Sequence, residues 1–186
     1  MARFTVTPTS LAGVVIVERQ RIGDARGFLS RIFCVDELRA AGFVLPVVQI
    51  NHTLTETAGT LRGLHFQHPP HAEDKLVTCL RGRVFDVAVD LRAGSPTFLG
   101  WHAEEISADN GRALLIPQGC AHGFQTLEDG CELLYLHSRA YAPDAEAGLS
   151  PLDPSLGIAW PLPVTTISAR DDGHPVIQED FTGVDA

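Results

Sequence analysis

The histidines of this chain gather in two places where they could exchange protons or bind a metal. His65, His68 and His71 lie within one short stretch, and His122 follows a Pro-Gln-Gly turn further along. Imidazole changes its protonation readily near neutral pH, and it is also a common metal ligand. A single histidine is often only a hydrogen-bonded strand residue, whereas two on one interior surface indicate a site.

The segment that ends at His122 has the spacing G-x5-P-x-G-x2-H, which resembles the second sequence motif of the cupin barrels. In metal-binding cupins an upstream H-x-H segment supplies further ligands, but here Gln67 replaces the second histidine after His65. An amide is a poor ligand for a divalent metal, so we expect no metal and no other cofactor. A metal held by His65, His122 and a third group, His68 or Glu73, stays open as an alternative.

The elements that must position these side chains are short strands. Phe85, Val87, Val89 and Leu91 occupy alternate positions and therefore share one face of a strand. Many such strands at regular spacing, with turn residues between them, predict an all-β sandwich or barrel. The predicted strands are residues 4–7, 13–18, 47–53, 60–66, 76–80, 84–91, 98–106, 113–116, 123–127 and 133–141.

Outside the strands, one short helix is predicted at residues 35–41, just before Gly42. From about residue 142 the chain is rich in Pro, Asp and Gly, which predicts loops and short helical turns around the barrel. Because no repeat or linker interrupts the 186 residues, we expect a single domain over residues 1–186.

The composition excludes several classes of partner. With 23 acidic and 14 basic residues the formal net charge is −9, whereas a nucleic-acid or anionic-membrane partner would require a basic surface. The sequence shows no apolar secretion signal and no apolar run long enough to span a membrane. Four cysteines without a CxxC pair predict free thiols in a cytoplasmic protein; they are Cys34, Cys79, Cys120 and Cys131.

Several longer segments occur in one order and carry a resemblance to a known family. They are Leu61–Gln67, Lys75–Val77, Val84–Arg92, Ser95–Phe98, Ser107–Asn110, Ile116–Phe124, Leu152–Pro154 and Ile158–Pro161. With these segments the chain resembles the dTDP-4-dehydrorhamnose 3,5-epimerases, nucleotide-sugar enzymes, from about Gly13 to Asp171. The resemblance implies a metal-free, cupin-type jelly roll that works as a homodimer. It also implies a reaction that removes protons beside a 4-keto group and returns them to the opposite face.

The chemistry of such a reaction requires a base and, on the other face, a separate acid. A proton beside a ketone is weakly acidic, so its removal also needs a group that stabilises the enolate oxygen. The resemblance implies that His65, in the R-G-L-H segment, is the base and that Tyr135 is the acid. A phenol has a reference pKa of about 10 and is protonated at neutral pH. Tyr141 is the alternative donor.

The resemblance also assigns an enolate stabiliser and a partner for the base. Lys75, the only lysine of the chain, matches the lysine ten residues after the base. A compact ammonium concentrates its charge at one point, whereas a guanidinium spreads it over a plane. Asp171 matches the aspartate that pairs with the base histidine and fixes its tautomer. Asp172 is adjacent and remains the alternative.

The remaining matched positions are expected to bind the nucleotide sugar. Guanidinium groups bind the phosphates of a nucleoside diphosphate through paired hydrogen bonds, and one arginine, Arg26, is expected to reach across the dimer. The resemblance places eight residues in this group: Arg26, Phe28, Gln49, Asn51, Arg62, His122, Glu146 and Arg170, the last replacing the usual lysine.

Some positions depart from the family motifs. Arg31 stands in place of a glutamate, and Ile50 in place of the aspartate of a Q-D-N segment. Glu73 and Asp74 replace the first two residues of Q-G-K, and Leu136 replaces a lysine. The first two lie at the nucleotide side and leave the identity of the nucleotide open. The others could narrow the reaction to one carbon.

Three alternatives follow from the same residues. The nearest is an enzyme that acts at C3 or C5 alone, or a 3,4-ketoisomerase on a related nucleotide sugar. A second is a metal-dependent cupin, such as a dioxygenase or a sugar-phosphate isomerase. A third is a non-catalytic sugar-binding barrel.

Overall fold

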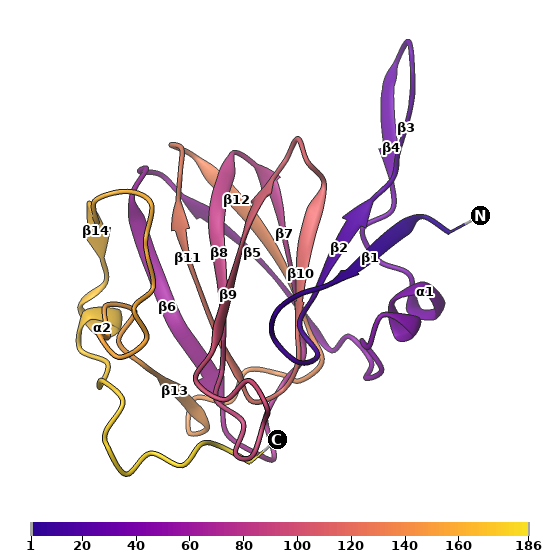
Figure 1. Cartoon of the computed structure of the whole chain (residues 1–186). Coiled ribbons are helices and arrows are strands. Elements are labelled where there is room, and N and C mark those ends of the chain that lie inside the picture. The colour runs from indigo at the N-terminus through magenta and orange to yellow at the C-terminus, as the bar shows by residue number, and fades with distance from the viewer. Residues whose placement is uncertain (1, 186) are drawn as a thin grey trace.

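Two antiparallel sheets face each other across an apolar core in the computed structural model, which describes residues 2–185 (Figure 1). The first sheet has the order β1-β2-β10-β7-β12-β5. Its strands are β1 (Phe4–Pro8), β2 (Val15–Arg19), β10 (Arg112–Ile116), β7 (Lys75–Arg81), β12 (Cys131–His137) and β5 (Gln49–Thr55).

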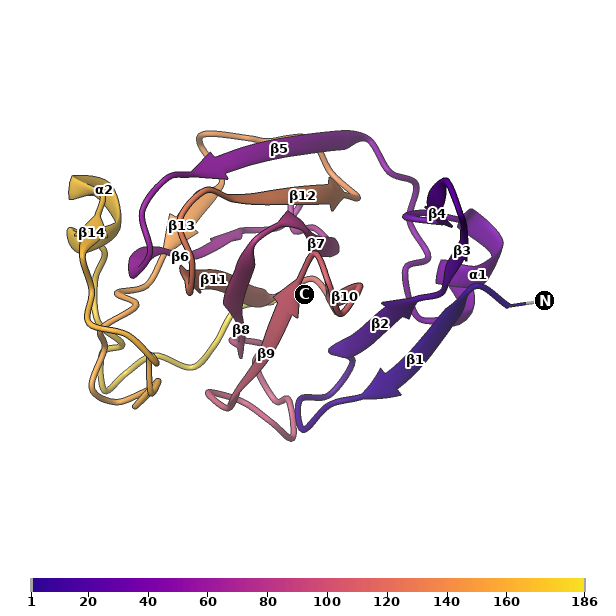
Figure 2. The same cartoon turned by 90° about the horizontal axis from the view of Figure 1, so that it is seen from above.

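The second sheet has the order β13-β6-β11-β8-β9, and a short strand, β14, pairs with β6 in parallel. Figure 2 shows the strands of both sheets around a common interior. The strands are β13 (Glu146–Gly148), β6 (Thr60–Gln67), β11 (Cys120–Thr126), β8 (Arg83–Asp90), β9 (Trp101–Ser107) and β14 (Thr166–Ile167).

The interior between the sheets is filled by alternate side chains of both. Val77 of β7 and Leu133 of β12 pack with Ala88 of β8 and Phe124 of β11 in one buried cluster. Because neighbouring residues of a strand point to opposite faces, the residues between them cover the outer surfaces. The cavity described below occupies one end of this interior, where polar residues replace the apolar ones.

Part of the outer face of each sheet is covered. The α1 helix (Val35–Ala40) and its flanking loops place Leu38 and Phe43 against the outer face of the first sheet, next to Leu76 and Leu136. The C-terminal segment covers the second sheet, where Trp160 and others pack on the face of β8 that carries the alternating residues Phe85, Val87 and Val89. The predicted shared face of this strand is therefore confirmed.

One element projects away from the two sheets. The strands β3 (Arg21–Asp24) and β4 (Gly27–Ser30) form a hairpin that extends beyond the barrel (Figure 1). Its apolar side chains are exposed, with Phe28 at 59% and Leu29 at 71% of their full accessibility. The Arg21 guanidinium lies 4.3 Å from the centroid of the Phe28 ring, and neither Phe28 nor Leu29 joins a buried apolar cluster within residues 2–185.

The all-β prediction is confirmed, and the helix predicted at 35–41 is found at 35–40. The strand pattern missed the β3–β4 hairpin as well as β13 and β14. The loops predicted from about residue 142 wrap the second sheet and include one helical turn, α2 (Ala169–Asp172). The four cysteines are free, and no helix in residues 2–185 has the length and apolar character needed to cross a membrane.

Candidate active site

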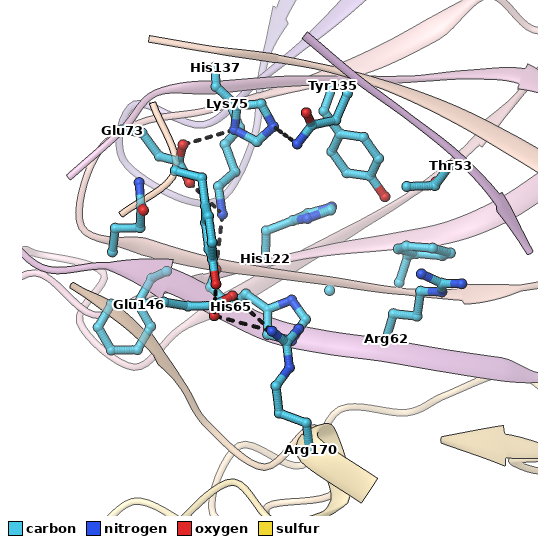
Figure 3. A pocket seen from close by; sticks show the side chains of 16 residues that line it. Thr53, Arg62, His65, Glu73, Lys75, His122, Tyr135, His137, Glu146 and Arg170 are labelled. Carbon is cyan, nitrogen blue, oxygen red and sulfur yellow. Dashed lines mark hydrogen bonds and ion pairs between the residues drawn. The ribbon is translucent and has the colours of Figure 1, made fainter. Parts of the chain in front are cut away.

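A cavity of about 290 Å³ opens between the two sheets, and most of the predicted catalytic side chains line it (Figure 3). His65 comes from β6 of the second sheet, whereas Lys75 of β7 and Tyr135 of β12 come from the first. The structure therefore places the predicted base and the predicted acid on facing sheets. Of the predicted binding residues, Asn51, Arg62, His122, Glu146 and Arg170 also line the cavity.

His65 is paired with a buried carboxylate. Its Nε2 lies 2.9 Å from Oδ1 of Asp171, whose side chain is only 4% exposed. The carboxylate requires a donor, so we assign a proton to Nε2, and Nδ1 is then the unprotonated ring nitrogen. Burial acts to raise the pKa of Asp171, but the hydrogen bonds from His65 and the Gly63 amide outweigh it. The pKa therefore lies well below its ordinary value.

The segment that carries Asp171 is fixed by local hydrogen bonds. Ser168 caps α2, because its hydroxyl accepts a hydrogen bond from the Asp171 amide at 3.0 Å. Just before this turn, β14 pairs with the start of β6 and ties the segment to the strand of the base. Asp171 is buried while Asp172 is exposed, so the carboxylate that pairs with His65 is that of Asp171 and not of its neighbour.

Two glycines let the strands around His65 approach closely. A Cβ atom on Gly63 would lie 2.5 Å from Cα of Gly123, and one on Gly123 would lie 2.7 Å from the Arg62 carbonyl oxygen. Gly63 also has a φ of +127°, which other residues rarely adopt. The register between β6 and β11 shifts at this point. The R-G-L-H segment thus needs its glycine to place Arg62 and His65 at the cavity.

The mouth of the cavity carries a second group of charges. Arg170 contacts both oxygens of Glu146, at 3.2 and 3.1 Å, and the Tyr141 hydroxyl donates to Glu146 at 2.8 Å. The guanidinium also lies 3.1 Å from His65 Nε2. Because that nitrogen donates to Asp171, Arg170 acts there as a neighbouring positive charge. The hydrogen bond to Glu146 raises the pKa of Tyr141.

Lys75 is held deep in the wall. Its Nζ donates to the His65 carbonyl oxygen at 3.1 Å and pairs with Glu73 Oε1 at 3.2 Å. Glu73 also accepts from Nδ1 of His137 at 2.8 Å. Burial acts to raise the pKa of Glu73, but His137 and Lys75 together lower it below its ordinary value. Lys75 therefore works as part of a pair and not as an isolated cation.

Tyr135 lies further inside, beside a second histidine–aspartate pair. Burial raises the pKa of its phenol, and the nearby Asp86 raises it further, so the hydroxyl stays protonated at neutral pH. The ring of His122 meets that of Tyr135 edge-on, with 5.9 Å between the centroids. Nε2 of His122 lies 2.7 Å from Asp86 Oδ1. The pKa of Asp86 is itself raised by complete burial.

Two of the predicted binding residues lie away from this cavity. Arg26 and Phe28 sit on the β3–β4 hairpin, and Arg26 pairs with Asp24 of the same hairpin. Within one chain they cannot complete the site. Gln49 does not line the cavity, but it donates to Asn51 at 3.1 Å beside the mouth.

The positions that depart from the family motifs have different surroundings. Arg31 pairs with Glu37 of α1, and Leu136 is buried against the outer face of the first sheet. Neither faces the cavity. Glu73 does, and so does Arg170, which replaces the usual lysine, so these two departures bear on the chemistry.

The metal site kept open from the sequence is not assembled. His122 is engaged by Asp86, Glu73 by Lys75 and His137, and His68 is exposed. A different group brings ligand atoms of His65, Asp171 and His174 within 4.8 Å of one another. The guanidinium of Arg170 lies at 3.1 Å from His65 and 3.4 Å from Asp171 Oδ1, and this positive charge opposes a cation there.

Three residues of the site were not predicted in their observed roles. His137 and Asp86 were assigned no role, and Glu73 was considered only as a metal ligand. A signal for Asp86 was present, because the alternation in β8 places it opposite the apolar face and toward the interior. Glu73 and His137 gave no such signal, since their contact depends on the pairing of β7 with β12, which places His137 opposite Lys75.

The cavity brings together a histidine paired with a carboxylate, a buried ammonium and, on the facing sheet, a protonated phenol. A reaction that removes a proton from carbon and returns it needs a base, a stabilising charge and an acid. The sequence comparison agrees: the model of the dTDP-4-dehydrorhamnose 3,5-epimerase family matches residues 8–179. The chain belongs to this family.

Individual relatives are similar over nearly their whole length. A dTDP-4-dehydrorhamnose 3,5-epimerase of Sinorhizobium fredii is 41% identical, over 91% of this chain and 88% of its own. A dTDP-4-dehydrorhamnose 3-epimerase of Streptomyces niveus is 38% identical, over 92% and 83%. The crystal structure of a Legionella pneumophila 3,5-epimerase in complex with dTDP-4-keto-L-rhamnose superposes with a TM-score of 0.88, at 37% identity over 93% and 92% of the two chains.

Proposed function

We propose that this protein is an isomerase of deoxysugar biosynthesis that epimerises a dTDP-4-keto-6-deoxyhexose at C3, C5 or both. The observation that carries the proposal is the position of His65, which is paired with Asp171, and of Tyr135 on facing sheets of one cavity that Lys75 also lines. The relatives named above act on, or bind, sugars of this class.

The first step is removal of a proton next to the ketone. Nδ1 of His65 takes the proton, and the C–H bonding electrons move to form the enolate. The imidazolium that results lies against the carboxylate of Asp171, 2.9 Å away. The negative charge of the enolate oxygen is stabilised by the Lys75 ammonium.

The second step returns a proton from the opposite side. The Tyr135 hydroxyl gives its proton to the carbon, and the configuration is inverted because donor and base lie on different sheets. Because the pKa of the phenol is raised, the Tyr135 hydroxyl stays protonated at neutral pH and can donate. The phenolate is then reprotonated from solvent, and His65 loses the proton that it gained.

Substrate binding is assigned to the remaining charged residues. Arg62 at the cavity and Arg26 are proposed to bind the diphosphate, while Gln49 and Asn51 contact the nucleotide. His122, Glu146 and Arg170 contact the sugar end. Phe28 is proposed to pack against the nucleotide from the same hairpin as Arg26. We expect no cofactor to take part.

Arg26 and Phe28 can reach a cavity only if it belongs to a second copy, so we further propose a homodimer of single-domain, cupin-type jelly rolls. Exposed apolar side chains on the hairpin and on the outer face of β5 support it, with Ile50 at 60% and Leu54 at 49% of full accessibility. We also place the enzyme in the cytoplasm, and its four free cysteines support that location.

The decisive experiment follows solvent deuterium into the sugar. In deuterium oxide, NMR should show exchange at C3, C5 or both of dTDP-4-keto-6-deoxyglucose, together with the couplings of an epimerised product. If the folded dimer binds dTDP but gives no exchange, the proposal is refuted, and the protein is instead a non-catalytic sugar-binding barrel. A panel of dTDP-, GDP-, CDP- and UDP-linked 4-keto sugars tests which nucleotide the enzyme requires on its substrate.

One alternative has specific support. The relative from Streptomyces niveus is named as a 3-epimerase, at 38% identity, so an enzyme that acts at a single carbon is the second candidate. Exchange confined to one carbon would establish it. A product in which the ketone has moved to C3 would instead indicate a ketoisomerase.

A further inference from the structure

A histidine that the proposed mechanism does not use lies against the base. The ring of His174, two residues after the end of α2, meets the ring of His65 edge-on, with 5.6 Å between the centroids and 74° between the planes. Its Nε2 lies 3.9 Å from Oδ1 of Asp171, too far for a hydrogen bond. The His174 side chain is 16% exposed and does not line the cavity. It therefore reaches the pair of His65 and Asp171 without entering the space for substrate.

The sheet leaves a space beside His65 that this ring fills. Gly148 of β13 is paired directly with His65 of β6, and cross-strand partners carry their side chains on the same face. A Cβ on Gly148 would lie 2.4 Å from Nε2 of His174 and 2.5 Å from its Cε1. Unlike Gly63, Gly148 has no positive φ, so its backbone would accept a side chain. The His174 ring thus stands in place of the side chain that residue 148 would otherwise put next to the base.

Two backbone hydrogen bonds hold His174 at this point. Its own amide donates to the Asp171 carbonyl oxygen at 3.4 Å. The carbonyl oxygen of the next residue, Pro175, accepts from the amide of Ser150 at 2.8 Å. The first bond fixes His174 to the turn that carries the carboxylate, and the second fixes it to the end of β13, where Gly148 lies.

The ring acts by packing and not by charge. Burial lowers the pKa of His174, and the neighbouring His65 and Arg170 lower it further. Asp171 and Glu146 act in the opposite direction without restoring the ordinary value, so the ring is neutral at neutral pH. Its Nε2 is buried and has no hydrogen-bond partner among residues 2–185. A neutral ring that makes no hydrogen bond to Asp171 leaves that carboxylate to His65.

We propose that His174 is a positioning residue, which fills the space left by Gly148 and keeps the His65 ring turned with Nε2 toward Asp171 and Nδ1 toward the substrate. The inference rests on the proposed role of His65 as the base. Without the ring, His65 can rotate away from Asp171 and present Nδ1 in more than one direction. A misplacement of about 1 Å in a reacting group can lower a rate by about 100-fold.

Removing the ring and then refilling its space test the proposal. His174→Ala should lower kcat by about tenfold while KM stays within about twofold, because the residue acts through the base and not on the substrate. Gly148→Ala should have a similar effect, since its methyl group forces the ring out of place. In the double variant Gly148→Ala/His174→Ala the methyl group occupies the vacated space, and kcat should regain at least about threefold over Gly148→Ala.

His102→Ala is the matched control. The His102 side chain is 19% exposed, and its Nε2 is likewise unpartnered among residues 2–185, 3.8 Å from a carboxylate oxygen of Glu104. It does not line the cavity, so its variant should retain the parent kcat. The inference would be overturned if kcat of His174→Ala stayed within about threefold of the parent, if its loss appeared in KM alone, or if the double variant were no better than Gly148→Ala.

NMR of the His65 ring gives a second readout that needs no activity, and it decides if His174→Ala does not fold. In the parent protein the Nε2 proton of His65 should exchange with water more slowly than the ring proton of the exposed His68, and in Gly148→Ala it should exchange faster. Equal exchange of the two parent protons would overturn the inference. If the parent showed the slow Nε2 proton but no deuterium exchange into the sugar, the proposed function alone would be refuted.

Discussion

The pair of His65 and Asp171 makes a quantitative prediction. Asp171→Asn removes the negative charge but keeps an oxygen that can accept from the Gly63 amide, as Asp171 does now at 3.1 Å. After proton abstraction, the imidazolium of His65 would have no carboxylate against it. Unit charges about 4 Å apart interact by about 4 kcal/mol at an effective dielectric constant near 20. His65 is one quarter exposed, so we reduce this figure to about 3 kcal/mol.

A loss of about 3 kcal/mol corresponds to roughly a 10²-fold fall in kcat. The assay is the initial rate of deuterium exchange into dTDP-4-keto-6-deoxyglucose, followed by NMR, for Asp171→Asn and for Asp172→Asn. Asp172 is exposed, so its variant should retain the parent rate. If Asp171→Asn stayed within threefold of the parent, or if the two variants lost activity equally, the carboxylate would not assist the base.

Other consequences can be measured separately. Tyr135→Phe should still exchange the substrate proton that His65 removes with solvent deuterium, but it should form little epimerised product. If deuterium exchange and product formation fell equally, Tyr135 would not be the proton donor. Lys75→Arg should lower kcat by at least about tenfold, because the larger planar cation must fit where the Lys75 side chain is 8% exposed; an unchanged rate would show that a point charge is not needed. The variants Arg26→Ala and Asp171→Asn should each be weakly active alone. If Arg26 serves the partner's site, a mixture of the two should regain activity, because a mixed dimer contains one site with both Arg26 and Asp171. Finally, burial acts to raise the pKa of Asp90, but hydrogen bonds from Arg92, Ser95 and Thr97 outweigh it and hold this pKa well below its ordinary value. Asp90 therefore stabilises the fold above its unfolded pKa of about 3.9 and loses that effect as pH falls through the folded pKa. Asp90→Asn should therefore lower the free energy of unfolding by about 2 kcal/mol at pH 7, and the difference should shrink in acid.

The sequence predicted the features that depend on local order along a strand. Alternation places Phe85, Val87 and Val89 on one face of β8, and this face packs against the C-terminal segment. The glycine of the R-G-L-H segment likewise reflects a local requirement. These features depend only on residues that are close in the sequence. Motifs and the alternation of apolar residues were therefore enough to predict them.

The parts that escaped prediction depend on contacts between distant segments. Glu73 meets His137 only because β7 and β12 pair in one register, and single-sequence periodicity contains no register. The β3–β4 hairpin escaped because Ile22, Phe28 and Leu29 are exposed and join no buried apolar cluster among residues 2–185, so no buried face marks it. β14 consists of two residues, too few for any pattern.

The position of Asp171 has a consequence for how the site is assembled. Most of the strands that line the cavity precede or include β12, which ends at His137, whereas the carboxylate that pairs with His65 is carried by α2, more than thirty residues later. The segment that carries it is joined to β6 by the two residues of β14. His65 therefore lacks its carboxylate until the segment of β14 and α2 docks beside β6.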